Sequence, residues 1–232
     1  MKGNGVLLLA GILSLTGCVM EKAGPVKNDF QVLERDDSES VRVNLRMGAG
    51  DLRVGTGTQK LMRADFAYNV PSWKPEVNYS SSAKHGTLRI EQPSGGSVHG
   101  NSKYEWDVRL NREVPIDLEV HFGAGEATLD LGSLDLNSVE VNMGVGELKM
   151  DLRGRPQRDY KVQIRGGVGE ATVRLPSDVG VYADAQGGIG EISAQGMRHE
   201  GSRYYNEAYG RSKPTIHLDV HGGVGSIRLI SE

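Results

Sequence analysis

The sequence contains one cysteine in 232 residues, few aromatic residues and no apolar run long enough to cross a bilayer as a helix. A single cysteine excludes a disulfide framework within the chain and any metal site built from several thiolates. Aromatic residues make up 6% of the chain, and the formal net charge of −3 at pH 7 gives no basic excess. We therefore expect no nucleic-acid partner, because such proteins usually carry a basic patch.

Glycine, in contrast, is abundant: 32 of the 232 residues are glycine, about twice the average share. Glycine destabilises the interior of a helix, so this composition disfavours a helical bundle. Charged residues make up 25%, a normal share for a folded protein and unlike a disordered polyelectrolyte. The composition predicts a folded chain that is not built from helices.

The N-terminus has the features of a secretory signal peptide, with Lys2 followed by an apolar stretch at 6–13. This stretch ends in Leu15-Thr16-Gly17-Cys18, which resembles a bacterial lipobox. The resemblance implies cleavage before Cys18, diacylglycerol on its thiol and acylation, with palmitate for example, of the new amine. We expect a signal peptide over 1–17 and a lipidated tether over 18–39, where no periodicity is sustained.

The lipid on Cys18 predicts that the membrane is one partner and that the protein lies in the cell envelope, on the extracytoplasmic side. In a bacterium with two membranes, Val19 favours the outer membrane facing the periplasm, because aspartate at that position is the usual signal for retention in the inner membrane.

One pattern recurs six times: alternating residues, a Gly-x-Gly corner, usually an acid, and alternation again. The corner glycines are Gly48 and Gly50, Gly123 and Gly125, Gly144 and Gly146, Gly167 and Gly169, Gly188 and Gly190, and Gly223 and Gly225. Alternation on both sides predicts two half-buried strands per repeat. The apolar residues between the glycines, Ala49, Ala124, Val145, Val168, Ile189 and Val224, are expected to plug corners of the core.

Repeats of 21–23 residues predict an all-β fold, an elongated β-solenoid or a stacked β-rack, with each coil beside the next. The repeats are expected over 114–232, with an insertion at 196–214. The region 40–113 is less regular. Its strand-like stretches at 64–68, 76–79, 87–90 and 104–110 predict an irregular antiparallel N-terminal part built onto the same sheet.

The glycine repeats, together with the segment from Tyr205 to Tyr209, resemble the bacterial toast-rack family, extracytoplasmic β-proteins related to the C-terminal domain of LiaF-like cell-wall-stress proteins. The resemblance covers about 40–231 and rests on the order and spacing of short motifs. It implies a rack-like β-fold and a link to envelope stress, and it implies no catalytic residues. The chain departs from LiaF-like proteins, which have transmembrane helices, because its expected anchor is a lipid.

The acids that follow the corners form the first candidate site: Asp51, Glu126, Glu147, Glu170 and Glu191. Alternation points them outward, and stacking would bring them into one column. Such a column could bind a cation or a glycan. The simpler interpretation is that each carboxylate accepts hydrogen bonds near its corner, or that the column is a solubilising edge. We expect no metal site, because Ca²⁺ usually takes six or more oxygen ligands.

Enzyme signatures are missing from the sequence. The Gly-x-Gly corners precede strands, whereas a dinucleotide fingerprint needs a third glycine and a helix. His121 and His221 occupy one repeat position in an exposed polar column, and His217 is too far from His221 along a strand to share a metal with it. A serine-hydrolase Gly-x-Ser-x-Gly elbow does not occur. We expect no catalytic residues, cofactor or metal.

The insertion is the second candidate site, through Arg203, Tyr204, Tyr205, Tyr209 and Arg211. Tyrosine and arginine are enriched at binding hot spots, and long loops in repeat proteins often bind partners. The other interpretation is a flap, in which Tyr205 and Tyr209 cover the core edge of the last coil with their hydroxyls solvated. The family resemblance at Tyr205 to Tyr209 favours this structural role.

The sequence as a whole predicts a lipid-anchored, non-enzymatic scaffold for an envelope protein or a cell-wall partner. Two alternatives stay open: a structural rack that self-associates through its ends, and a carbohydrate-active β-solenoid enzyme.

Overall fold

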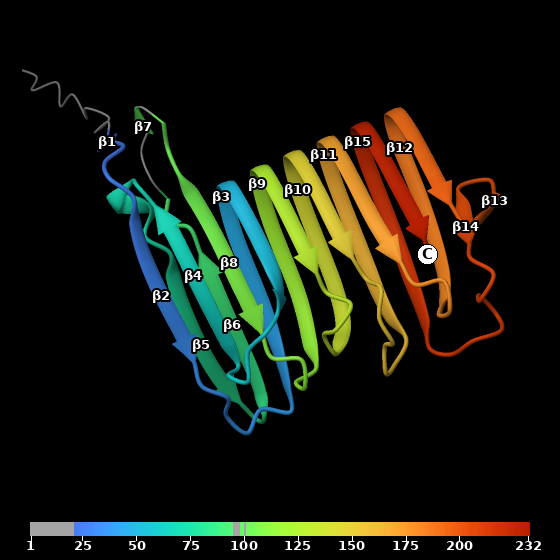
Figure 1. Ribbon diagram of the computed structural model, residues 1–232, viewed down its shortest axis with the longest axis horizontal. Helices are drawn as coiled ribbons and strands as arrows, with labels where there is room; N and C mark the ends of the chain where they lie inside the picture. Colours follow the sequence, from blue (N-terminus) through green and yellow to red (C-terminus); the bar gives the residue numbers. More distant parts are fainter. Residues whose placement is uncertain (1–20, 95–97, 100) are drawn as a thin grey trace, which may run out of the picture.

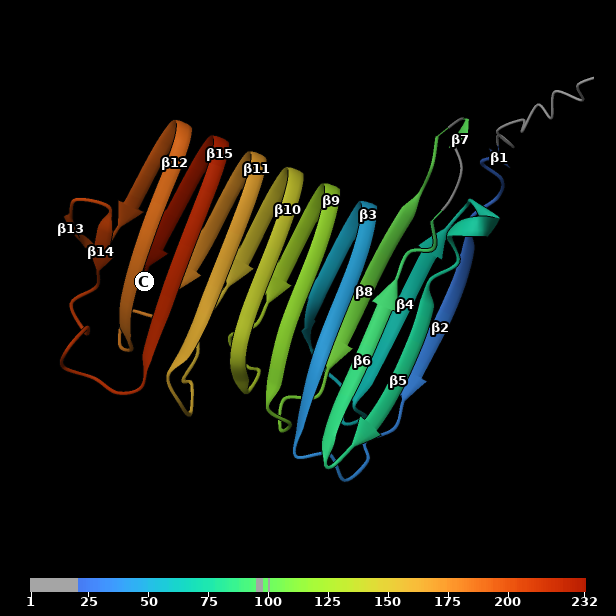
Figure 2. The ribbon, with the colours of Figure 1, turned by 180° about the vertical axis from the view of Figure 1, so that it is seen from behind.

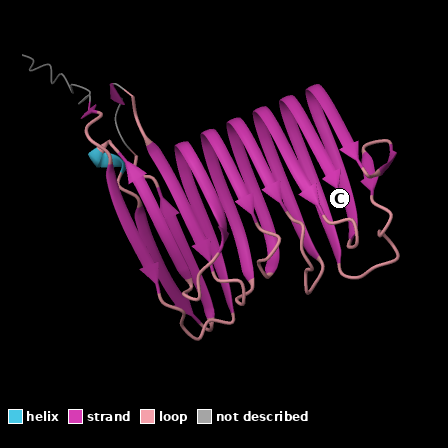
Figure 3. Ribbon diagram, viewed as in Figure 1, coloured by secondary structure: helices cyan, strands magenta, loops and turns pink. Residues whose placement is uncertain are grey.

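The computed structural model describes residues 21–94, 98–99 and 101–232, so the expected signal peptide and Cys18 lie outside the described residues. The described chain is almost entirely β-structure, which confirms the all-β prediction; a 3-10 turn, η1, spans Pro71–Trp73 (Figure 3). The strands are β1 (Glu21–Lys22), β2 (Lys27–Leu33), β3 (Ser40–Thr56), β4 (Met62–Tyr68), β5 (Glu76–Ser82), β6 (His85–Glu91), β7 (Val98–His99), β8 (Tyr104–Leu110), β9 (Ile116–Asp130), β10 (Leu136–Asp151), β11 (Tyr160–Leu175), β12 (Gly180–Gln195), β13 (Arg198–Glu200), β14 (Arg203–Tyr205) and β15 (Thr215–Ser231).

Six long strands carry the Gly-x-Gly corners: β3, β9, β10, β11, β12 and β15. Each bends at its corner, so that a first arm before the corner and a second arm after it lie in two facing layers (Figure 1). Neighbouring bent strands pair in parallel along both arms, with Gly146 opposite Gly125 on one side and Gly169 on the other. The fold is thus a rack of bent strands. This is the stacked β-rack, the second of the two forms predicted from the sequence.

The irregular N-terminal part extends both layers beyond β3. In the first layer, β6 pairs in parallel with the first arm of β3, and β5 pairs antiparallel with β6. In the second layer, β8 pairs in parallel with the second arm of β3, followed by β4 and β2 in antiparallel pairings. The predicted antiparallel excursion onto the same sheet therefore exists, although its two links to β3 are parallel (Figure 2).

The rack does not follow the order of the sequence at its C-terminal end. The last strand, β15, pairs with β11 on one side and with β12 on the other. The expectation that each coil lies beside the next is wrong here, and β12 is the outermost bent strand. The insertion at 196–214 provides the length of chain that returns from β12 and places β15 between its two neighbours.

The core lies between the layers and is filled by the alternating residues of both arms. Val141 and Met143 before the corner of β10, and Leu148 and Met150 after it, are all buried. The residue between the corner glycines is different: Val145 is 54% exposed and Ile189 is 74% exposed. The expectation that these residues plug the core is wrong, because the apex side chain points away from both layers.

The segment 27–33, which we expected to belong to a flexible tether, forms β2 at the edge of the second layer. Its burial is the inverse of the usual pattern: Phe30 and Val32 are exposed, whereas Asp29 and Gln31 are partly covered. The expected boundary at 113/114 falls in the connection between β8 and β9.

Candidate functional site

The insertion lies against the free side of the first arm of β12. Its two short strands, β13 and β14, form an antiparallel hairpin. β14 continues the first layer by pairing antiparallel with β12, with Tyr205 opposite Tyr182. The amide of Ala185 also donates to the carbonyl of Ser202 at 3.0 Å. The hairpin therefore covers part of a sheet edge that would otherwise leave backbone groups unpaired.

Asn206 fixes the insertion to the end of the rack, and it was not among the residues singled out from the sequence. Its side chain is 1% exposed. The amide nitrogen donates to the carbonyl oxygens of Pro176 at 3.0 Å and Val179 at 2.7 Å, and the amide oxygen accepts from the backbone N–H of Val181 at 2.9 Å and Tyr209 at 3.1 Å. All the hydrogen-bonding groups of this buried amide are thus satisfied.

The three tyrosines of the insertion occupy two different environments. Tyr204 is buried, with its ring stacked on His199 at a centroid distance of 5.3 Å. Tyr205 and Tyr209 are only half-buried and lie on the outer surface of the first layer. Strand alternation explains the difference between Tyr204 and Tyr205, because neighbouring side chains on β14 point to opposite faces.

Tyr205 and Tyr209 belong to an aromatic patch that also contains Tyr182 of β12 and His217 of β15. The Tyr182 ring centroid lies 5.5 Å from Tyr205, 5.9 Å from Tyr209 and 5.8 Å from His217, and Tyr205 and Tyr209 are 5.2 Å apart. These separations fall within the range of interacting aromatic pairs. Strands β12, β14 and β15, together with the turn that carries Tyr209, thus build one partly exposed surface of four rings.

The surroundings of the aromatic patch are polar and partly cationic. Arg203 and Arg211, two of the predicted residues, are exposed within the insertion. Sequence reasoning found Tyr205 and Tyr209 but missed Tyr182 and His217. Tyr182 joins the patch because β14 pairs with β12, whereas His217 reaches Tyr182 because β15 unexpectedly lies beside β12.

The acids of the predicted column do occupy one register position along the rack. However, the column is interrupted, and neighbouring cations pair with part of it. Asp51, Glu126, Glu147 and Glu170 lie opposite one another in succession, and Ser226 of β15 separates Glu170 from Glu191. The Nζ of Lys149 lies 3.0 Å from Glu126 and 3.0 Å from Glu147, and Arg228 pairs with Glu170. These cations neutralise the middle of the column, which gives a cation-binding strip no support.

A second row runs along the outer face of the first arms, immediately before the corners. In register order it contains Arg46, His121, Asn142, Arg165, His221 and Gln186, and we call it the basic row. Hydrogen bonding from His121 lowers the pKa of Glu119, with the charges of His121 and Arg46 acting in the same direction. The first four members of the row, from Arg46 to Arg165, line a shallow groove of about 680 Å³.

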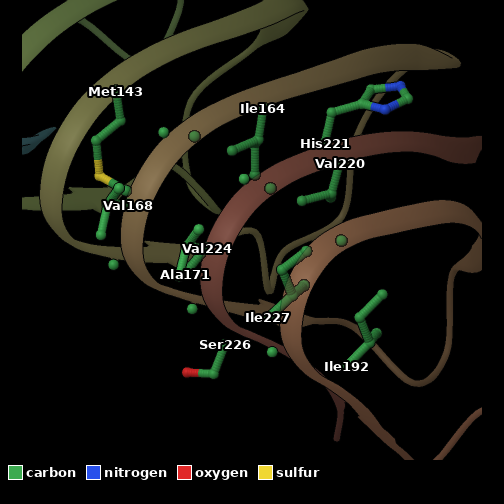
Figure 4. A pocket seen from close by; sticks show the side chains of 18 of the residues that line it. Met143, Ile164, Val168, Ala171, Ile192, Val220, His221, Val224, Ser226 and Ile227 are labelled. Carbon is green, nitrogen blue, oxygen red and sulfur yellow. The ribbon is translucent and has the colours of Figure 1, made fainter.

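A small, partly open cavity of about 30 Å³ lies under the bends of β11, β15 and β12. The buried residue before the corner is Met143 in β10, whereas Gly166 takes its place in β11. Ala171 after the corner is also small, so neither side fills the space (Figure 4). In β15, Ile227 leans toward Gly222 and compensates for the missing side chain. The cavity is a packing defect and is too small for an organic ligand.

Neither a metal centre nor a membrane-spanning helix is present in the part of the chain that the structure describes. No group of three or more His, Cys, Asp or Glu side chains there is placed to hold a metal ion. The same residues contain no helix long and apolar enough to cross a bilayer.

Comparison with known proteins gives two family matches. The N-terminal domain of toast_rack, DUF2154, matches residues 22–174, and the family described as "Cell wall-active antibiotics response LiaF, C-terminal" matches residues 124–229. No curated protein matches the chain.

Among solved structures, a candidate cell adhesion protein from Clostridium sporogenes ATCC 15579 is similar, with 36% sequence identity and a TM-score of 0.84, over 90% of this chain and 100% of that one. A candidate adhesin from Bacteroides fragilis NCTC 9343 also matches, with 12% identity and a TM-score of 0.37, over 90% and 99% of the two chains. The family match over residues 22–174 agrees with the rack of bent strands. The chain therefore belongs to the toast-rack family.

Proposed function

We propose that the protein is a lipid-anchored, non-enzymatic binding scaffold of the cell envelope, which presents the aromatic patch to another envelope protein. The patch is the observation that carries this proposal. It combines four partly exposed rings with arginines of the insertion, the residue types that dominate hot spots at protein interfaces.

The rigidity of the surroundings also supports a binding role. The buried Asn206 amide and the pairing of β14 with β12 hold Tyr205 and Tyr209 against Tyr182. Rings that are already ordered lose less conformational entropy when a partner binds than rings on a mobile loop do.

The comparisons support the same proposal at the level of the family. The similar protein from Clostridium sporogenes is a candidate cell adhesion protein, and the LiaF family is described by a response to antibiotics that act on the cell wall. We extend both descriptions to this chain: it binds a partner in the envelope and takes part in envelope stress. The lipid on Cys18 would keep it there, facing the periplasm from the outer membrane in a bacterium with two membranes.

The test uses the purified, lipidated protein to capture partners from crosslinked envelope fractions. The variant Tyr182→Ala with Tyr209→Ala removes two rings of the patch. Phe30→Ala is the matched control, because Phe30 is an aromatic residue that is 53% exposed on β2, away from the patch. We expect the double variant to lose a discrete captured protein while the control retains it.

Capture that is the same in all three proteins would overturn the role of the patch. If the protein cosediments with purified peptidoglycan and the double variant does not, the partner is a cell-wall glycan and not a protein. Melting temperatures of the variants show whether a loss of capture comes from unfolding.

Self-association is a second candidate function, favoured by the second arm of β12. Among the described residues that arm pairs only with β15, so its other edge is open. An open strand edge can pair with another chain. A molecular mass that rises with concentration in light scattering would support it, and a constant monomer mass would exclude it.

A further inference from the structure

We propose that the row of corner apex side chains lies against the bilayer to which the chain is tethered, so that the bent edge of the rack faces the membrane. This row, the bend ridge, consists of Ala49, Ala124, Val145, Val168, Val224 and Ile189 in register order. The inference rests on the lipid anchor proposed above, but it concerns a surface that neither the aromatic patch nor the anchor explains.

The bend ridge is exposed and apolar along its whole length. Val145 is 54% exposed, Val168 and Val224 are each 47% exposed, and Ile189 is 74% exposed. Each side chain is flanked by two glycines, so no neighbouring side chain shields it. Parallel strands about 4.8 Å apart place these residues in one continuous line. A polar residue would serve an exposed apex equally well, so the β-branched apolar residues require another explanation.

Exposed apolar side chains are concentrated on this edge of the molecule. Among the described residues, the large apolar side chains that are exposed are Val26, Phe30, Val32, Val145, Val168, Ile189 and Val224. Four of them belong to the bend ridge, and Val26 precedes the start of β2, which is at the same edge. Only Phe30 and Val32 lie elsewhere, along β2.

The described chain also begins at this edge. Lys27, the first residue of β2, is in register with Tyr68, which is in register with Tyr104. The carbonyl of Tyr104 lies against the corner glycine Gly50, so β2 starts at the level of the bends. The first described residue, Glu21, belongs to β1 at the same edge (Figure 1). Because Cys18 is three residues earlier, its Cα can be at most about 11 Å from the Cα of Glu21, so the lipid would be attached near this edge.

The two long edges of the rack differ in the exposed apolar side chains that they carry. The edge opposite the bends carries the connections between strands, and ion pairs gather there, including Lys84 with Glu39 at 2.6 Å and Arg158 with Asp135 at 3.0 Å. At the bent edge the bend ridge instead runs between the basic row and the acidic column. The charged members of the basic row are themselves paired with acids, among them Arg165 with Glu140 at 3.2 Å and His221 with Asp219 at 2.7 Å. The remaining N–H groups of the arginines and of Asn142 can still donate hydrogen bonds to lipid phosphates.

A bilayer fits this surface better than a protein does. The bend ridge is one residue wide, so it offers far less area than the roughly 800 Å² per partner of a stable protein interface. A membrane contact can be weaker, because the anchor makes it intramolecular and gives the ridge a high effective concentration at the bilayer. Short apolar side chains at the level of the lipid headgroups then suffice to orient the rack.

The experiment places a fluorophore on each edge of the lipidated full-length protein. Cys18 is the only cysteine, and lipidation blocks its thiol, so an added cysteine can be labelled alone. Val168→Cys puts an environment-sensitive fluorophore on the bend ridge. Arg155→Cys is the control, since the Arg155 side chain is 90% exposed in the connection between β10 and β11 at the opposite edge. The proteins are reconstituted into vesicles of equal parts phosphatidylethanolamine and phosphatidylglycerol, with and without brominated acyl chains.

We expect the fluorophore at 168 to shift to shorter wavelength and to be quenched by brominated lipid, and the fluorophore at 155 to show neither change. Equal responses at the two positions, in proteins that float with the vesicles, would overturn the bend ridge proposal and leave the anchor intact. Failure of the unmodified protein to float, together with labelling of its Cys18 thiol, would overturn the anchor and the ridge proposal with it.

Discussion

Gly146 lies so close to the carbonyl oxygen of Gly125 on the neighbouring strand that a Cβ on Gly146 would be 1.9 Å from that oxygen. Gly146 also has a φ of +140°, which side chains rarely tolerate. The same two constraints recur at each step of the rack, and for this reason adjacent bends can stack at the spacing of paired strands. Replacement of Gly146 therefore tests the bend itself.

We predict that Gly146→Ala lowers the free energy of unfolding by more than the roughly 1–3 kcal/mol that a strained φ costs, because the neighbouring backbone must also move. Gly57→Ala is the control: Gly57 has a φ of +129° but no atom within 4 Å of a built Cβ. Urea unfolding of both variants measures the difference. Equal destabilisation would show that backbone conformation alone, and not close stacking, requires the glycine.

Gly166→Ala should have the opposite effect. A Cβ at Gly166 would meet only the Cε of Met143 at 3.7 Å, at the edge of the cavity of about 30 Å³. Added contacts and a less flexible unfolded chain should raise stability by about 0.5–1 kcal/mol. The neighbouring variant Gly167→Ala should destabilise, since its Cβ would lie 2.4 Å from the carbonyl oxygen of Gly144. A lower melting temperature for Gly166→Ala would contradict this description of the cavity.

Asn206→Ala should detach the insertion from the end of the rack. It leaves the backbone N–H of Val181 and two carbonyl oxygens without their side-chain partner in a buried site. We expect a loss of about 2–3 kcal/mol in the free energy of unfolding. Glu207→Ala, an exposed neighbour, is the control and should change stability little. Thermal unfolding of both variants measures this difference. An unchanged melting temperature for Asn206→Ala would show that attachment of the insertion does not depend on this amide.

Asp36 should make the protein sensitive to acid. Hydrogen bonding from the Ser38 side chain, aided by the Tyr79 hydroxyl 2.8 Å away, lowers the pKa of Asp36 from 3.8 to about 2. A carboxyl whose pKa is lower in the folded state stabilises that state above its unfolded pKa, and this contribution is lost as the pH falls. The loss should therefore occur between pH 3.8 and about 2. Asp36→Asn should flatten the dependence of melting temperature on pH in that interval, and Asp37→Asn should not.

The sequence predicted the repeated part of the fold because period-two alternation and regular glycine spacing are local signals. The pattern around Met143 and Leu148, for example, defines the bend and its buried face without knowledge of any other strand. The placement of β15 between β11 and β12 could not be predicted, because all bent strands have nearly the same pattern and would fit beside any other. The contact of His217 with Tyr182 was missed for this reason.

Other errors came from the chemistry of single positions. Val145 and its equivalents are apolar, so they were assigned to the core, but the apex of a bend points outward. Asn206 was not singled out, because asparagine is mostly an exposed residue and its burial follows only from the fold. In β2 the alternation of Phe30 and Val32 with polar residues is too short to distinguish a strand from a linker.

The central claim is that the aromatic patch binds a partner in the envelope, and crosslinking in living cells tests it most directly. A photoreactive phenylalanine analogue replaces Tyr209 in the patch or, as a control, the exposed His85 near the other end of the rack. Irradiation followed by immunoblotting should give a discrete crosslinked band from position 209 that disappears in the Tyr182→Ala background and is missing from position 85. No band from position 209, or the same bands from both positions, would contradict the account.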